Sequence, residues 1–168
     1  MVMEFDPSSI ARTQTDPKRR WLMLQGPVWH QSVDGRRQAL IVKDVVLGLN
    51  PGDPIDCSSL LYIVGAGLVE VDIPPDHLGT RAWLSRKEDG GYRIVVASTI
   101  DADQLPRGTG YGLIDQAPKV FAVTHEIGHL LIRGHLPRSV QTRVASTDTE
   151  ERFCDEFGRE LIADGWVL

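Results

Sequence analysis

The chain is poor in cysteine and has no long apolar segment. Its 168 residues include two cysteines, Cys57 and Cys154, which do not form a CxxC pair, and this excludes a disulfide framework and a zinc ribbon. No window approaches the roughly 18 apolar residues of a membrane-spanning helix. The first 16 residues also lack the apolar core of a signal peptide. These absences predict a cytoplasmic protein that does not bind membranes.

The sequence also lacks an excess of basic residues. It has 18 Lys and Arg against 23 Asp and Glu, with a formal net charge of −5, so it gains no general attraction to nucleic acid. Residues 18–20 form a small basic cluster, which we interpret as a solvated patch. We therefore expect no direct binding to nucleic acid.

The length of the chain and its lack of internal repeats predict one domain. Residues 1–20 are polar and contain two prolines, so we interpret them as an N-terminal arm of uncertain order. Residues 21–168 would form the single domain.

The first two thirds of the chain is rich in short, strand-like segments. Ala39–Leu49 and Leu60–Val64 are apolar runs, and Leu68–Ile73 alternates between apolar and other residues. Arg81–Arg86 and Tyr92–Ser98 flank a turn rich in Asp and Gly, the pattern of a hairpin. Together these segments predict a small sheet, mainly antiparallel.

Two helices are predicted in the last third. Apolar residues recur at helical spacing before Gly134, and Asp115 is placed to cap the start of that helix. A second helix is predicted from about Asp148 to Asp164. Thr147 and Glu150 at its start have the spacing of a capping box.

The first of these helices contains an HExxH motif, because residues 125–129 read HEIGH. Residues four apart lie on one helix face, so His125 and His129 are placed to hold one metal ion. Neutral imidazole suits zinc. Glu126 lies beside them and would act as the base for a metal-bound water. The alternative is a helix whose two histidines and glutamate have no metal.

A catalytic zinc site needs a third protein ligand and one open position. Glu151, near the start of the second helix, is the first candidate. Asp155 lies one turn later and could accept a hydrogen bond from a zinc-binding histidine. The alternative for Glu151 is a solvated carboxylate at a helix N-terminus.

His135 is the rival third ligand, because it lies ten residues after His125 as in the extended HExxHxxGxxH motif. That motif needs a glycine at position 132, where this chain has Ile132, and the class needs a methionine turn downstream. All three methionines lie upstream of the motif. These departures favour Glu151.

Four further features allow more than one interpretation. Cys154 could approach the metal as a thiolate and close the open position, or pack as a small buried residue. Tyr111 and His77 are candidates to stabilise an oxyanion. Arg81–Ser85 is an ordinary strand or an edge strand that also receives an extended substrate.

Two segments carry a family resemblance. Residues 125–131 read HEIGHLL and residues 151–162 read ERFCDEFGRELI, which resemble HELGHLLL and E-x-x-A-[ND]-x-F-A-x-x-L-L of the ImmA/IrrE metallopeptidases. The resemblance covers about residues 68 to 162. Cys154 and Gly158 replace the usual alanines.

The resemblance implies an α+β, minimal zincin-like fold in which the sheet packs on the HExxH helix and on a C-terminal helix that bears a ligand. It implies a metallopeptidase domain over residues 21–168. By match to the family motif, the metal ligands would be His125, His129 and Glu151, the catalytic base Glu126, and Asp155 a neighbour of the ligands.

Zinc is the expected metal, with manganese as the alternative. The expected function is that of an endopeptidase that cleaves a helix-turn-helix transcriptional repressor. Two alternatives remain: a metal-containing binding module that sequesters a regulatory partner without cutting it, and a zinc hydrolase with three histidine ligands that uses His135.

Overall fold

The computed structural model describes residues 10–25, 34–72, 82–98, 117–133 and 147–167. These residues form an α+β arrangement, as the sequence predicted. In chain order the elements are α2 (Pro17–Leu24), α4 (Gly35–Ile41), the π-helical segment η1 (Val42–Val46), β1 (Ile55–Asp56), α5 (Cys57–Val64), β2 (Ala66–Val71), β3 (Ala82–Arg86), β4 (Tyr92–Ala97), α6 (Ala117–Arg133), α8 (Asp148–Leu161) and β5 (Trp166–Val167).

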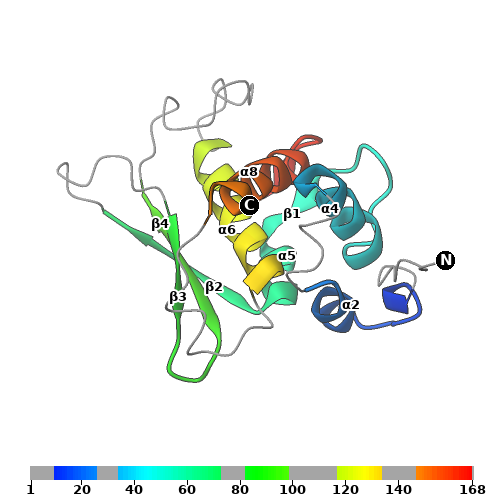
Figure 1. Ribbon diagram of the computed structural model, residues 1–168, viewed down its shortest axis with the longest axis horizontal. Helices are drawn as coiled ribbons and strands as arrows, with labels where there is room; N and C mark the ends of the chain where they lie inside the picture. Colours follow the sequence, from blue (N-terminus) through cyan, green and yellow to red (C-terminus); the bar gives the residue numbers. More distant parts are fainter. Residues whose placement is uncertain (1–9, 26–33, 73–81, 99–116, 134–146, 168) are drawn as a thin grey trace.

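The elements form layers around α6. Figure 1 shows β2, β3 and β4 on one side of α6 and the remaining helices on the other. α6 packs against β3 and β4, and α8 packs between α6 and α4. The HExxH helix therefore lies in the middle of the protein, with the sheet on one side and α8 on the other.

The three-stranded sheet has the order β2-β4-β3 and is mixed. β3 and β4 form the predicted antiparallel hairpin, with Ala82 opposite Val96. β2 pairs with β4 in parallel. β1 and β5 form a separate parallel pair. The prediction of a mainly antiparallel sheet is therefore wrong. β4 is the strand with a continuous buried run, Ile94–Ala97, and a strand buried on both faces is favoured at the centre of a sheet.

The apolar run Ala39–Leu49 is helical as far as Val46, although its β-branched residues favour a strand. Asp34 caps α4 by accepting a hydrogen bond from the Arg37 N–H (2.8 Å). The helix continues as η1, in which three valines are buried with Lys43. Burial of the segment against α8 and α2 overrides the local preference for strand.

The run Leu60–Val64 also belongs to a helix, α5. Asp56 caps its start by accepting a hydrogen bond from the Ser59 N–H (3.2 Å). Gly65 ends it in the left-handed conformation, with φ 73°. The apolar residues Trp21 and Leu24 lie in α2, and both are buried.

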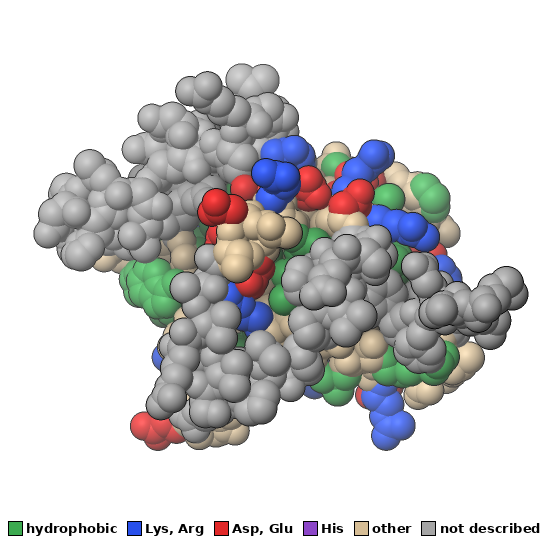
Figure 2. All heavy atoms as spheres, viewed as in Figure 1, with side chains coloured by type: hydrophobic (Ala, Val, Ile, Leu, Met, Phe, Trp, Pro, Cys, Tyr) green, Lys and Arg blue, Asp and Glu red, His purple; other side chains and the backbone are tan. Residues whose placement is uncertain are grey.

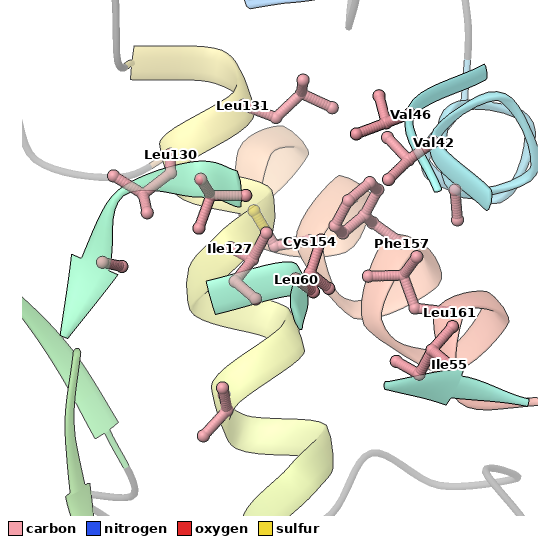
Figure 3. Packing of buried hydrophobic residues seen from close by; sticks show 14 of the residues in the cluster. Val42, Val46, Ile55, Leu60, Ile127, Leu130, Leu131, Cys154, Phe157 and Leu161 are labelled. Atoms are coloured by element: carbon pink, nitrogen blue, oxygen red, sulfur yellow. The ribbon is translucent and has the colours of Figure 1, made fainter. Parts of the chain in front are cut away.

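The hydrophobic core joins the helices to one another. Figure 3 shows Ile127 and Leu131 of α6, Phe157 of α8 and Leu60 of α5 in one cluster, which Val42 and Val46 complete from η1. None of the described helices has the length and apolarity to cross a membrane.

The two predicted C-terminal helices are present as α6 and α8. Thr147 caps α8, since its hydroxyl accepts a hydrogen bond from the Glu150 N–H (3.1 Å). Asp115 and Gly134, the predicted limits of α6, lie outside the described residues. α8 and α4 approach closely at Gly35, where a Cβ atom would lie 2.1 Å from the Phe153 carbonyl oxygen.

Candidate metal centre

α6 supplies the two histidines from a fully buried stretch. His125 and His129 are one turn apart and are 5% and 8% exposed. Glu126 is buried beside them at 9%. Polar side chains in such surroundings need partners, because an unpaired buried polar group costs about 1–3 kcal/mol.

Small residues at the α6–α8 contact bring the second helix to these histidines. A Cβ atom on Gly158 would lie 2.9 Å from Thr124 Oγ1 and 3.0 Å from the backbone nitrogen of His125. A Cβ atom on Gly128 would lie 3.1 Å from Cys154 Sγ. The first turn of α8 can reach the histidines because neither glycine has a side chain.

Three predicted ligands meet at one point. The Nε2 atoms of His125 and His129 are 3.2 Å apart. The Glu151 carboxylate places Oε2 3.0 Å from His125 Nε2 and Oε1 3.2 Å from His129 Nε2. The structure thus brings together two side chains from α6 and one from α8 through the atoms that would bind a metal.

Each histidine also has a carboxylate at its other ring nitrogen. His125 Nδ1 lies 2.8 Å from Asp155 Oδ1, the partner that the sequence suggested. His129 Nδ1 lies 2.8 Å from Glu150 Oε1. When each Nδ1 donates its proton to its carboxylate, the lone pair of each Nε2 is directed to the point where the three ligands meet.

Burial and hydrogen bonds act against each other at His125. Burial alone would lower its pKa, because it disfavours the charged imidazolium. Hydrogen bonds with Asp155 and Glu151, together with the nearby charge of Glu126, outweigh burial and raise the pKa of His125 to about 9. The surroundings therefore favour a positive charge at this point.

Glu150 and Arg133 are parts of the centre that sequence reasoning missed, since Glu150 was taken only as a capping-box residue. Arg133 donates from Nε to Glu150 Oε1 (2.7 Å) and from its second guanidinium nitrogen to Oε2 (2.8 Å). Burial would raise the pKa of Glu150, but hydrogen bonds from His129 and Arg133 and their charges hold it below its usual value. The spacing of His129 and Arg133, one helical turn, could have indicated the connection.

His125, His129 and Cys154 form a buried group that could hold a metal ion, because one ligand atom from each lies within 4.8 Å of the others. Cys154 is fully buried in the hydrophobic cluster, as Figure 3 also shows. Burial, together with the charges of Glu150 and Glu151, raises the pKa of its thiol well above the usual value.

The donor set fits a divalent cation on charge and spacing. Two imidazoles and one carboxylate are ordinary zinc ligands, and ligands on a tetrahedral zinc ion are about 3.3 Å apart. The two Nε2 atoms are 3.2 Å apart and each faces a different Glu151 oxygen at 3.0 or 3.2 Å, which is close to that spacing. Four carboxylates, those of Glu126, Glu150, Glu151 and Asp155, surround the histidines, and Arg133 offsets the charge of one.

The centre opens into a cleft of about 500 Å³ between α6 and the sheet. Glu126, His129 and Glu151 line it on one side, and all of β3 with Tyr92 lines the other. His135, Tyr111, His77 and Arg81 lie outside the described residues. Where α4 and α8 are visible in Figure 2, Lys and Arg side chains are intermixed with Asp and Glu side chains.

Comparison of the chain with protein-family models, with curated proteins and with solved structures found no match.

Proposed function

We propose that the protein is a zinc-dependent endopeptidase whose metal ligands are His125, His129 and Glu151. The observation that carries the proposal is the meeting of the two Nε2 atoms and the Glu151 carboxylate within 3.2 Å of one another. Two neutral imidazoles with their lone pairs directed at each other repel, and a cation between them removes the repulsion. Manganese is the alternative metal.

Glu151 is favoured over Cys154 as the third ligand for two reasons. Its oxygens lie within 3.2 Å of both Nε2 atoms, and its side chain is 45% exposed, toward the cleft. Cys154 lies on the core side, and burial holds its thiol in the protonated form, whereas metals bind the thiolate. With Glu151 as ligand, a fourth position remains open on the side of the cleft, which a catalytic zinc site requires.

Glu126 is the proposed catalytic base. It is adjacent to His125 and lines the same cleft as His129 and Glu151, so a water in the cleft next to the ligands is within its reach. When bound, zinc would acidify water and polarise the substrate carbonyl. Glu126 would accept the proton of the attacking water and return it to the amine nitrogen as the peptide C–N bond breaks.

β3 is the proposed binding strand for the substrate. Among the described residues it is an edge strand of its sheet, and it lines the cleft opposite the ligands. The Lys87 N–H bonds to the Gly91 carbonyl across the hairpin (2.8 Å). Since bonded pairs alternate in an antiparallel ladder, the backbone groups of Ala82 and Leu84 point away from β4. An extended peptide could pair with them as an added strand.

The narrower proposal, that the substrate is a helix-turn-helix transcriptional repressor, rests on the ImmA/IrrE resemblance. Incubation of the zinc-loaded chain with the product of a neighbouring repressor gene tests it. Intact repressor after incubation at equimolar protein would count against this substrate class.

The test of the peptidase itself is Glu126→Gln, with Glu156→Gln on α8 as the matched control. Glu126→Gln should keep one equivalent of zinc and lose at least about 100-fold in kcat/KM, the usual contribution of a general base. Glu156→Gln should keep both the bound zinc and the kcat/KM of the unchanged protein. Full peptidase or biological activity in Glu126→Gln would reject the peptidase and favour the non-cleaving module.

One observation favours that module as the second candidate. If Cys154 were to become a ligand, the two histidines, Glu151 and the thiolate would make four protein ligands and close the site. A closed site is structural and does not activate water. The protein would then act by binding a regulatory partner. Metal analysis of single-ligand variants separates the two, as set out in the Discussion.

A further inference from the structure

The two histidines of the centre are held by carboxylates in unequal surroundings. Asp155, the partner of His125, has a side chain that is 28% exposed. Glu150, the partner of His129, is 9% exposed. A carboxylate this deeply buried needs further hydrogen bonds, because it has lost its water.

Arg133 supplies those bonds from the same helix face as His129. Its guanidinium approaches Glu150 in a two-pronged arrangement, at 2.7 Å to Oε1 and 2.8 Å to Oε2. Oε1 also accepts from His129 Nδ1 at 2.8 Å. Such bidentate pairs fix the plane of the carboxylate as well as its position. The Glu150 oxygen therefore has one orientation toward the imidazole.

We propose that Glu150, locked by Arg133, is a positioning residue that sets the tautomer and ring orientation of His129 for metal binding. An acceptor at Nδ1 keeps the proton on that nitrogen and leaves Nε2 free to bind the metal. Arg133 acts through the two hydrogen bonds that it donates to the Glu150 carboxylate. This inference rests on the proposed function, because it presupposes the metal centre.

The position of the pair has a consequence for the assembly of the centre. Glu150 is adjacent in sequence to Glu151, and the Glu150 N–H donates a hydrogen bond to the Thr147 hydroxyl. The pair thus joins the end of α6 to the first turn of α8, beside the proposed third ligand. Loss of the pair should loosen Glu151 as well as His129.

The proposal is tested by zinc affinity, which is measured by competition with a chromophoric chelator. The visible spectrum of the Co²⁺ form is a second readout. Glu150→Gln should weaken zinc binding about 10–100-fold, the usual effect of such partners, and alter the Co²⁺ spectrum. Glu156→Gln, the same chemical change on the same helix, should leave both unchanged. Activity is not the readout, because Arg133 also lines the cleft.

A double-mutant cycle separates positioning from general stability. Arg133→Met should weaken zinc binding in the same direction, and Arg133→Met with Glu150→Gln should be no weaker than the more affected single variant, because Arg133 acts through Glu150. Losses that multiply would overturn the proposal. So would a zinc affinity of Glu150→Gln within twofold of the control.

Two further outcomes decide the remaining cases. If Glu150→Gln does not fold without metal, Arg133→Lys takes its place as the test. Lysine keeps the positive charge but cannot form the two-pronged contact with Glu150. Unchanged zinc affinity and Co²⁺ spectrum in a folded Arg133→Lys variant would then reject the proposal. A wild-type chain that binds neither zinc nor manganese rejects the proposed function together with this inference, whereas wild-type binding that Glu150→Gln leaves intact rejects the inference alone.

Discussion

His125 and His129 direct their Nε2 atoms at each other across 3.2 Å, while the Nδ1 atom of each is bonded to a carboxylate. Both nitrogens cannot be lone-pair acceptors at this distance without a positive charge between or on them. A proton on one ring or a metal ion shared by both satisfies the arrangement. The two cations compete for the same position, so metal binding there should depend on pH.

The third ligand can be identified by metal content. Glu151→Ala should lower bound zinc well below one equivalent after dialysis against a weak chelator, because two histidines alone leave the site incomplete. Cys154→Ala and His135→Ala should retain it. Zinc loss in both Cys154→Ala and Glu151→Ala would instead favour the closed site with four protein ligands, and loss in His135→Ala the site with three histidines.

Zinc binding and the stability of the metal-free chain should depend on pH in opposite directions. Burial disfavours the imidazolium of His125, but hydrogen bonds with Asp155 and Glu151 raise its pKa to about 9, above the usual 6.5. A raised pKa stabilises the metal-free fold fully below pH 6.5, and this contribution, roughly 3 kcal/mol, is lost as the pH rises through 9. Zinc must displace that proton, so its affinity should rise over the same interval, by up to about tenfold per pH unit.

Urea unfolding and chelator competition at several pH values measure both trends. Asp155→Asn removes the strongest hydrogen-bond partner of the charged His125 ring. Metal-free stability and zinc affinity should therefore both depend less on pH in that variant. Metal-free stability that stays constant between pH 6.5 and 9 would contradict this account of His125.

Gly35→Ala should destabilise the fold, although replacing glycine by alanine within a helix normally stabilises a protein by up to about 1 kcal/mol. The added Cβ would fall 2.1 Å from the Phe153 carbonyl oxygen, which forces α4 away from α8. We expect a loss of at least about 2 kcal/mol in urea unfolding. At Gly67 the nearest atom to an added Cβ is the end of the Lys87 side chain at 3.6 Å, so Gly67→Ala is the control and should stay within about 0.5 kcal/mol.

Proline substitutions in β3 test the substrate-binding edge. Ala82→Pro removes an N–H that points away from β4, so kcat/KM for a peptide should fall by about tenfold, the loss of one hydrogen bond, with little change in Tm. Ser85→Pro removes an N–H that points toward β4 and should lower Tm instead. An unchanged kcat/KM in Ala82→Pro would show that the substrate does not pair with β3.

Three features that are local in sequence were predicted correctly. The spacing of His125 and His129, the cap at Thr147 and the β3–β4 hairpin depend on residues within a few positions of each other, and the structure has all three. Local geometry fixes such features.

The helical state of Ala39–Val46 was not predicted. Its β-branched residues indicate a strand, and an apolar run buried on several faces has no clear period. The caps at Asp34 and Asp56 were local signals for helices in this part of the chain that were not used. The parallel pairing of β2 with β4 has no local signal, because it joins strands separated by β3.

The sequence alone determined which residues could bind a metal, because four-residue spacing on a helix places His125 and His129 on one face. Only the tertiary structure decided what surrounds them. The approach of α8 to α6 at Gly128 and Gly158 brings Glu151 to both Nε2 atoms and Glu150 to His129. Contacts between helices depend on packing over the whole domain, and no short segment of sequence encodes them.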